Sequence, residues 1–145
     1  MSAAMWYAES HKLESEDTYP YYAYDDSCQW NSTEGLVNVT AIYNVTANNA
    51  SQLIAAAALG PVSVAIEADS DDFQYYEWGV FNGIGCGDNL DHGVTVVGYD
   101  LDNYYYIVRN SWGEGWGDMG YIKMYIEDGE GTCGIQMEPV WPETN

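Results

Sequence analysis

Short apolar segments separated by glycine- and aspartate-rich turns make up most of the second half of the sequence. Residues 93–99, 104–109 and 120–125 are each rich in β-branched or aromatic side chains, the composition that strands favour. Residues 79–87, which precede these three segments, are rich in glycine and are predicted to be a loop or a bulged strand. Several antiparallel strands in succession indicate a barrel or a strongly curved sheet.

The first half supplies the predicted helices. Residues 3–13 show helical spacing, and residues 50–59 can form a helix that Asn48 or Asn49 caps and that Gly60 and Pro61 end. The alternation of apolar and polar residues over 36–45 predicts a strand. A buried strand is predicted over residues 62–66, and one helical turn over residues 73–76. Helices followed by strands indicate an α+β fold. The chain shows no repeat, linker or low-complexity tail, so we expect one domain over residues 1–145.

The charge is strongly one-sided. Three Lys and Arg against 23 Asp and Glu give a formal net charge of −20. Binding to nucleic acid needs clustered basic residues, so a nucleic-acid partner is excluded, and an anionic membrane surface is disfavoured. Self-repulsion eases as carboxylates are protonated, which favours an acidic compartment. The longest apolar run, residues 53–59, is far shorter than a membrane span, so we expect no membrane insertion.

Cysteines and sequons together favour the secretory route. The three cysteines, Cys28, Cys86 and Cys133, are odd in number, so one is a free thiol or pairs with another polypeptide. Four N-glycosylation acceptors fall within about twenty residues. They are Asn31, Asn38, Asn44 and Asn49.

Histidine chemistry has two candidates. His11 lies among polar residues and is interpreted as an inert surface residue, whereas His92 begins an apolar strand and is followed by Gly93. Asn110 leaves a buried strand and is followed by Trp112 in a run rich in tryptophan and glycine. An asparagine oxygen can orient an imidazole, and a tryptophan over that hydrogen bond excludes water. This arrangement suits a base for nucleophilic catalysis.

The sequence resembles the papain-like cysteine peptidases, the cathepsin L branch most closely. The motifs that carry the resemblance are Tyr19-Pro20-Tyr21 before Cys28, Gly60-Pro61-Val62-Ser63-Val64-Ala65, Leu90-Asp91-His92-Gly93, Val97-Gly98-Tyr99, Asn110-Ser111-Trp112-Gly113, Gly120-Tyr121-Ile122 and Cys133-Gly134-Ile135. The resemblance covers the β-rich C-terminal half of such a peptidase, and residues 1–13 are similar to the end of the last helix of the other half. It implies a barrel-like antiparallel sheet with short flanking helices.

The resemblance also implies roles for individual residues. His92 is the general base, Asn110 orients it and Trp112 shields their hydrogen bond. Cys86 and Cys133 match a disulfide, and Cys28 matches a cysteine whose partner lies in the missing N-terminal half, so it is expected to be an unpaired thiol. That half also holds the nucleophilic cysteine, so we expect a lysosomal or extracellular cysteine endopeptidase whose C-terminal half is inactive alone.

The implied substrate pocket for the second residue before the scissile bond is lined by Ala65, Leu90, Gly93 and Glu138, and Asp91 is placed with them. Glu138 predicts acceptance of arginine as well as leucine or phenylalanine. Implied partners are peptide or protein substrates, the missing N-terminal half and cystatin-type inhibitors. No cofactor or metal is implied.

Two alternatives stay open. The chain can be a non-catalytic, peptidase-derived binding module, or one half of a naturally split enzyme. The acidic stretches at residues 67–72 and 100–102 lack the ligand spacing of an EF-hand loop and are interpreted as solvated turns.

Overall fold

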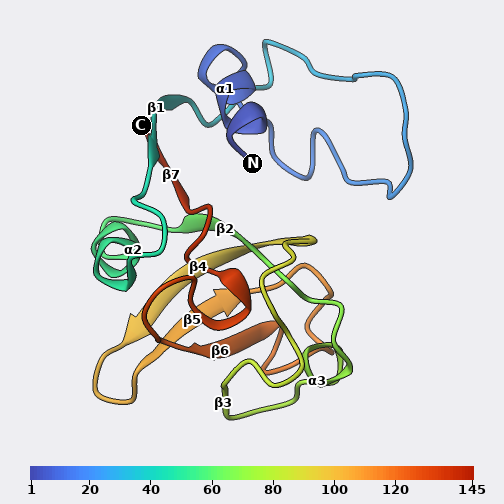
Figure 1. Cartoon of the computed structure of the whole chain (residues 1–145). Helices are drawn as coiled ribbons and strands as arrows, with labels where there is room; N and C mark the ends of the chain where they lie inside the picture. The colour runs from blue at the N-terminus through green and yellow to red at the C-terminus, as the bar shows by residue number, and fades with distance from the viewer. The chain divides into compact units, whose positions relative to one another are not determined.

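The computed structural model describes all 145 residues, which form two compact units (Figure 1). Unit 1 comprises Met1–Tyr43 and Pro142–Asn145, and unit 2 comprises Asn44–Trp141. Both borders fall inside strands, β1 (Val39–Asn44) and β7 (Val140–Thr144), where the sequence contains no linker. No helix in either unit has the length and apolarity needed to cross a membrane.

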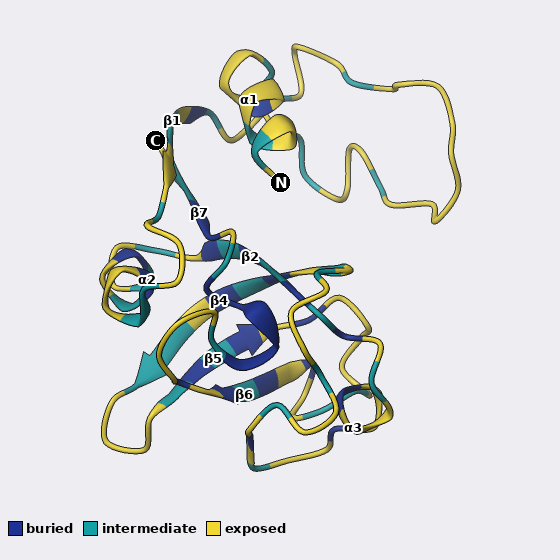
Figure 2. Ribbon diagram, viewed as in Figure 1, coloured by how far each residue is buried: buried dark blue, intermediate teal, exposed yellow.

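Unit 1 has one helix and little regular structure. Helix α1 (Ser2–Ser10) confirms the predicted first helix, and β1 confirms the strand predicted over residues 36–45. The hydroxyl of Thr40 donates to the backbone oxygen of Glu143 at 3.2 Å, which ties β1 to the end of β7. The chain between α1 and β1 is long and mostly exposed, and Figure 2 shows it almost entirely in the colours of exposed and intermediate residues.

Unit 2 is built on a curved sheet. Its strands are hydrogen-bonded in the order β7, β2, β4, β5, β6, β3, and their bounds are β2 Val62–Ile66, β3 Val80–Phe81, β4 His92–Asp100, β5 Tyr105–Arg109 and β6 Tyr121–Tyr125. Of the five predicted strands, the four in this unit correspond to β2, β4, β5 and β6. The pairings β2–β4, β4–β5 and β5–β6 are antiparallel, as predicted. The exception is β3, which lies within residues 79–87 and pairs with β6 in parallel. Neither β7 nor the short 3-10 helix η1 (Thr132–Gly134) was predicted.

The core of unit 2 lies between the sheet and its helices. Along β2, Val62, Val64 and Ile66 are fully buried and alternate with half-buried residues, as a strand with one covered face requires. Helix α2 (Ala50–Ala57) packs Leu53 and Ala56 into the same core. This element matches the predicted helix, and the Asn49 side chain accepts from the backbone N–H of Gln52 at 3.1 Å, the N-cap that the sequence indicated.

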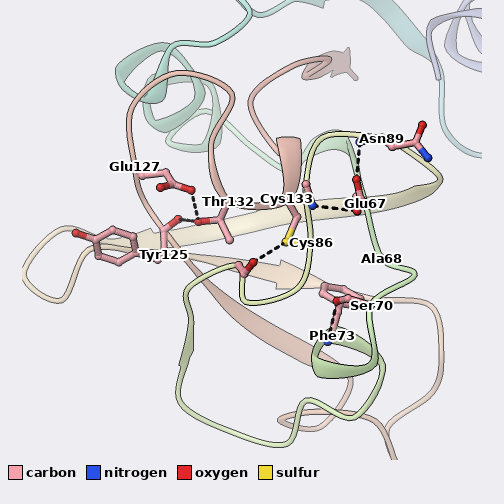
Figure 3. The surroundings of a disulfide bond; sticks show 12 residues. Glu67, Ala68, Ser70, Phe73, Cys86, Asn89, Tyr125, Glu127, Thr132 and Cys133 are labelled. Atoms are coloured by element: carbon pink, nitrogen blue, oxygen red, sulfur yellow. Dashed lines mark hydrogen bonds between the residues drawn. A yellow bond between two sulfur atoms is a disulfide. The ribbon is translucent and has the colours of Figure 1, made fainter.

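The loop that precedes β4 is held by a disulfide and a carboxylate (Figure 3). Cys86 and Cys133 form the disulfide implied by the family resemblance, joining this loop to η1. Glu67 follows β2 and accepts from the backbone N–H groups of Gly87 at 2.9 Å and Asn89 at 2.6 Å. The interpretation of Glu67 as part of a solvated turn is therefore wrong, because its carboxylate satisfies two backbone donors of the loop that leads to His92.

A buried polar network lies within the core of unit 2. The Tyr106 hydroxyl donates to Gln136 Oε1 at 2.9 Å, and Gln136 Nε2 donates to the backbone oxygen of Gly129 at 2.7 Å. Both side chains are fully buried, and burial raises the pKa of the Tyr106 phenol above its ordinary value. The network connects β5 to the chain between β6 and η1.

The variant Tyr106→Phe is expected to lower the free energy of unfolding by about 1–3 kcal/mol, because Gln136 Oε1 is left buried without its donor. Urea denaturation followed by tryptophan fluorescence measures the loss. Tyr105→Phe is the matched control: that ring is half-exposed on the adjacent position, and its loss is expected to stay within about 0.5 kcal/mol. Equal losses in the two variants would contradict a structural role for the network.

Candidate active site

His92 and Asn110 meet because β4 and β5 are antiparallel neighbours. His92 is the first residue of β4, and Asn110 directly follows the last residue of β5. The start of one strand thus lies beside the end of the other, and His92 Nε2 is 2.8 Å from Asn110 Oδ1. Residues 18 positions apart in the chain become one hydrogen-bonded pair, as the chemistry of the sequence suggested.

The direction of this hydrogen bond follows from a second one. Asn110 Oδ1 also accepts from the backbone N–H of Ser111 at 2.7 Å, which identifies that atom of the amide as the oxygen. An amide oxygen only accepts, so His92 Nε2 carries the proton that it shares with Asn110. In the neutral ring Nδ1 is then the unprotonated nitrogen, the atom that can act as a base.

Asn110 is held in place by burial and by its backbone. The residue is 8% exposed, and its backbone N–H donates to the oxygen of Gly120 at 3.0 Å. Its side-chain Nδ2 is buried without a hydrogen-bond partner. An unpaired buried donor costs free energy, so the orientation of the amide is set by the two hydrogen bonds at Oδ1, from His92 and from Ser111.

Trp112 covers one face of the imidazole. Its ring stacks on His92 with centroids 5.0 Å apart and an angle of 30° between planes. Phe73 from α3 (Asp71–Gln74) meets Trp112 edge-on at 5.7 Å, and Trp116 does so at 5.3 Å. Trp116 is itself fixed, since its indole N–H donates to the backbone oxygen of Gln74 at 2.9 Å. The stack excludes water from one side of the His92–Asn110 hydrogen bond.

The acidic segment before α3 has a structural use that the sequence did not indicate. Ser70 caps α3 by accepting from the backbone N–H of Phe73 at 3.3 Å, and Phe73 is fully buried. Phe73 thus reaches the aromatic stack, and Tyr76 of the same region meets Trp116 at 5.8 Å. The signals of Phe73 in the sequence are its place at the end of an acidic stretch and the helical turn predicted over residues 73–76.

The residues predicted for the substrate pocket lie in several places. Ala65 and Gly93 are register partners of β2 and β4. Leu90 lies against Gly134, where an added Cβ would come within 2.7 Å of Leu90 Cδ2. Asp91 turns to the backbone, accepting from the N–H of Ala68 at 2.8 Å. Glu138 is exposed on the chain between η1 and β7.

The remaining nucleophile and histidine candidates lie apart from this pair in the chain. Cys86 and Cys133 are joined and have no thiol. Cys28 is a free, exposed thiol of unit 1. Burial raises the pKa of the Tyr7 phenol, and the neighbouring Cys28 sulfur raises it further. His11 stacks on Tyr7 at 3.9 Å, and its Nδ1 lies 3.0 Å from the backbone oxygen of the same residue, an arrangement that secures the end of α1.

Residues 1–143 match the model of the papain family cysteine proteases. The chain belongs to this family. A thiol protease, SEN102, from Hemerocallis sp. is 43% identical over 98% of this chain and 41% of its own length. Procathepsin L from Felis catus is 41% identical over 85% of this chain and 39% of its own length. The chain therefore spans about two fifths of these curated relatives.

Solved structures agree with this assignment. The bromelain protease from Ananas comosus, in complex with the E64 inhibitor, aligns with a TM-score of 0.86 and 37% identity over 96% of this chain and 66% of that one. A cysteine protease from Carica candamarcensis, in complex with E-64, aligns with a TM-score of 0.89 and 35% identity over 98% of this chain and 67% of that one. The predicted α+β papain-like C-terminal fold and the family resemblance are confirmed.

Replacing Trp112 by alanine is expected to open the His92–Asn110 hydrogen bond to water, because the stacked indole is removed. The imidazole Nε2–H signal in proton NMR measures this: it should exchange with solvent faster and broaden. Trp78→Ala is the matched control, since that indole is 82% exposed and makes no contact in the stack. An unchanged Nε2–H exchange rate in Trp112→Ala would show that the stack does not shield the pair.

Proposed function

We propose that this chain forms the general acid–base half of a cysteine endopeptidase active site. The observation that carries the proposal is the His92 Nε2 to Asn110 Oδ1 hydrogen bond of 2.8 Å beneath a stacked Trp112. Membership in the papain family supports the reaction class, and the substrates are peptides or proteins. Asn110 is a positioning residue, because it acts on the ring orientation of His92.

The geometry leads to a mechanism in two steps. A cysteine thiolate attacks the scissile carbonyl carbon, and the C–N bond breaks as the His92 imidazolium gives its Nδ1 proton to the leaving amine. The product is a thioester. His92 Nδ1 then removes a proton from water, the resulting hydroxide attacks the thioester, and the C–S bond breaks to regenerate the thiolate. Throughout, the second imidazole proton remains on Nε2 and is donated to Asn110 Oδ1.

The thiolate belongs outside these 145 residues. Cys86 and Cys133 form a disulfide, and Cys28 follows no nucleophile signature. Since the chain spans about two fifths of its curated relatives, the nucleophile and oxyanion donor are assigned to the N-terminal half of such a peptidase. That half is the principal proposed partner, and cystatin-type inhibitors are a further one.

The proposed setting is acidic. The net charge of −20 is partly neutralised as pH falls toward the pKa of carboxylates, and an imidazolium partner keeps a thiol ionised in acid. Passage through the secretory pathway to a lysosome or the exterior also permits the Cys86–Cys133 disulfide.

A complementation assay tests the proposal. Hydrolysis of a fluorogenic dipeptide substrate is measured at about pH 5 under mild reduction, first with this chain alone and then with the N-terminal half of a close relative added. We expect turnover only in the mixture. His92→Ala in the mixture should lower the rate by about 10²–10⁴-fold, the usual contribution of general acid–base catalysis.

Two results would count against this function. Activity of the chain alone that Cys28→Ala abolishes would place the nucleophile in unit 1. If sedimentation shows that the two halves form a stable complex and the mixture still does not hydrolyse the substrate, the alternative is favoured, a binding module derived from a peptidase.

Glu138 is proposed to set substrate preference. Its exposed carboxylate lies four residues after Gly134, which contacts Leu90. Beside the apolar residues Ala65 and Leu90, a carboxylate can pair with an arginine without excluding leucine or phenylalanine. The proposed pocket therefore accepts both kinds of side chain.

In the assembled enzyme, Glu138→Ala should lower kcat/KM for a substrate with arginine at the second position before the scissile bond by about tenfold, as expected for losing one ion pair of about 1.4 kcal/mol. The leucine substrate should change little. Glu130→Ala removes an exposed carboxylate from the chain before η1; it is the control and should leave the ratio unchanged. Equal losses for arginine and leucine would exclude this role of Glu138.

A further inference from the structure

Unit 2 contains a groove of about 730 Å³ that shares no residue with the candidate active site. It is bordered by the start of α2, the turn between β4 and β5, and the chain that follows β6 (Figure 1). Its volume is that of a small-ligand site, about 300–1,000 Å³. The lining residues are Asn48, Asn49, Ala50, Ser51, Ile54, Leu101, Tyr104, Tyr125, Ile126, Glu127, Asp128 and Gly129.

The lining combines aromatic rings with oxygen acceptors. Tyr104 and Tyr125 are 55% and 42% exposed, so their rings are available for contact. Glu127 and Asp128 add two carboxylates, which disfavour an anionic ligand by charge repulsion. An uncharged sugar suits this lining, because the C–H face of a pyranose packs on an aromatic ring and its hydroxyls donate to carboxylate oxygens.

Asn49 places an N-glycosylation acceptor in this groove. It is the acceptor residue of the Asn49-Ala50-Ser51 sequon and lies in the groove lining. Its Oδ1 accepts from the backbone N–H of Gln52 at 3.1 Å and from the Ser51 hydroxyl at 2.8 Å. These bonds use the oxygen, so Nδ2, the atom that carries an N-linked glycan, is spared by the helix cap.

We propose that Asn49 carries an N-linked glycan whose first sugars lie in this groove against Tyr104 and Tyr125. In the transfer, Asn49 Nδ2 bonds to C1 of N-acetylglucosamine while the C1–O bond to a lipid diphosphate donor breaks. The diphosphate leaves with the electron pair, and Nδ2 loses one proton. The proposal rests on the secretory route and is independent of the peptidase function.

The other sequons differ in their surroundings. Asn44 is exposed and is not part of the groove lining, and Asn31 and Asn38 belong to unit 1. A glycan on Asn44 thus serves as an internal comparison, since it adds the same sugars to unit 2 without reaching the groove lining.

The test compares two sequon variants secreted from a eukaryotic host. Ser51→Ala removes the Asn49 glycan and keeps the capping Oδ1, and Thr46→Ala removes the Asn44 glycan. Mass spectrometry of the glycopeptides should find Asn49 occupied in the parent chain. Ser51→Ala should lower Tm by ~2–4 °C through loss of the sugar contacts, whereas Thr46→Ala should leave Tm nearly unchanged.

Two controls separate the glycan from the substitution. In the same variants, refolded oxidatively from bacteria without glycans, Ser51→Ala should lower Tm much less than it does in the glycosylated chain, because only the exposed Ser51–Asn49 hydrogen bond is lost. Tyr104→Asn keeps a residue that tolerates the left-handed backbone at this position (φ 57°) and removes the ring. In the glycosylated Tyr104→Asn variant, the further change Ser51→Ala should lower Tm only slightly.

Direct contact is read by NMR, as nuclear Overhauser effects between the acetyl methyl of the first sugar and the Tyr104 or Tyr125 ring. An unoccupied Asn49 in the folded, secreted chain would overturn the proposal. The proposal would also be overturned if Asn49 is occupied but removal of its glycan lowers Tm no more than removal of the Asn44 glycan does. Neither result bears on the complementation assay, which needs no glycan.

Discussion

The hydrogen bond between His92 and Asn110 depends on the register of β4 and β5. Thr95 pairs with Arg109, so the start of β4, which carries His92, and the end of β5, which Asn110 follows, lie side by side. A slip of one residue would turn Asn110 to the opposite face. The buried side chains of Val94, Val96 and Val108 prevent such a slip, because it would expose them to water. The apolar core of unit 2 is thus also what positions the candidate base.

Two further devices restrict the imidazole. The disulfide and the Glu67 carboxylate hold the loop that enters β4, and the stack of Trp112, Trp116 and Phe73 holds one face of the ring. The first acts on the backbone before His92 and the second on its side chain. A base held at both levels loses little conformational entropy when it acts, which is the benefit of a preorganised site.

Local patterns predicted the elements in which burial follows a regular period. The helix at α2 and the strands β2, β4, β5 and β6 came from alternation, capping and turn residues, and the pairing of His92 with Asn110 came from their chemistry together with the family resemblance. Strand β7 was not predicted because its proline-containing sequence carries no period. Strand β3 has only two residues and lies within residues 79–87, which were predicted to be a loop or a bulged strand. The role of Glu67 depends on bonds to residues 20 and 22 positions away, and no local pattern reports such bonds.

The β4–β5 hairpin separates the two sites of unit 2. His92 and Asn110 lie where the hairpin begins and ends, whereas Leu101 and Tyr104 of the groove lie at its turn. β4 has nine residues, so about 30 Å of strand lies between them. A glycan seated at the turn can therefore stabilise the hairpin without entering a substrate cleft at its open end. Because both sites share the same two strands, order imposed at the turn also supports the register on which His92 and Asn110 depend.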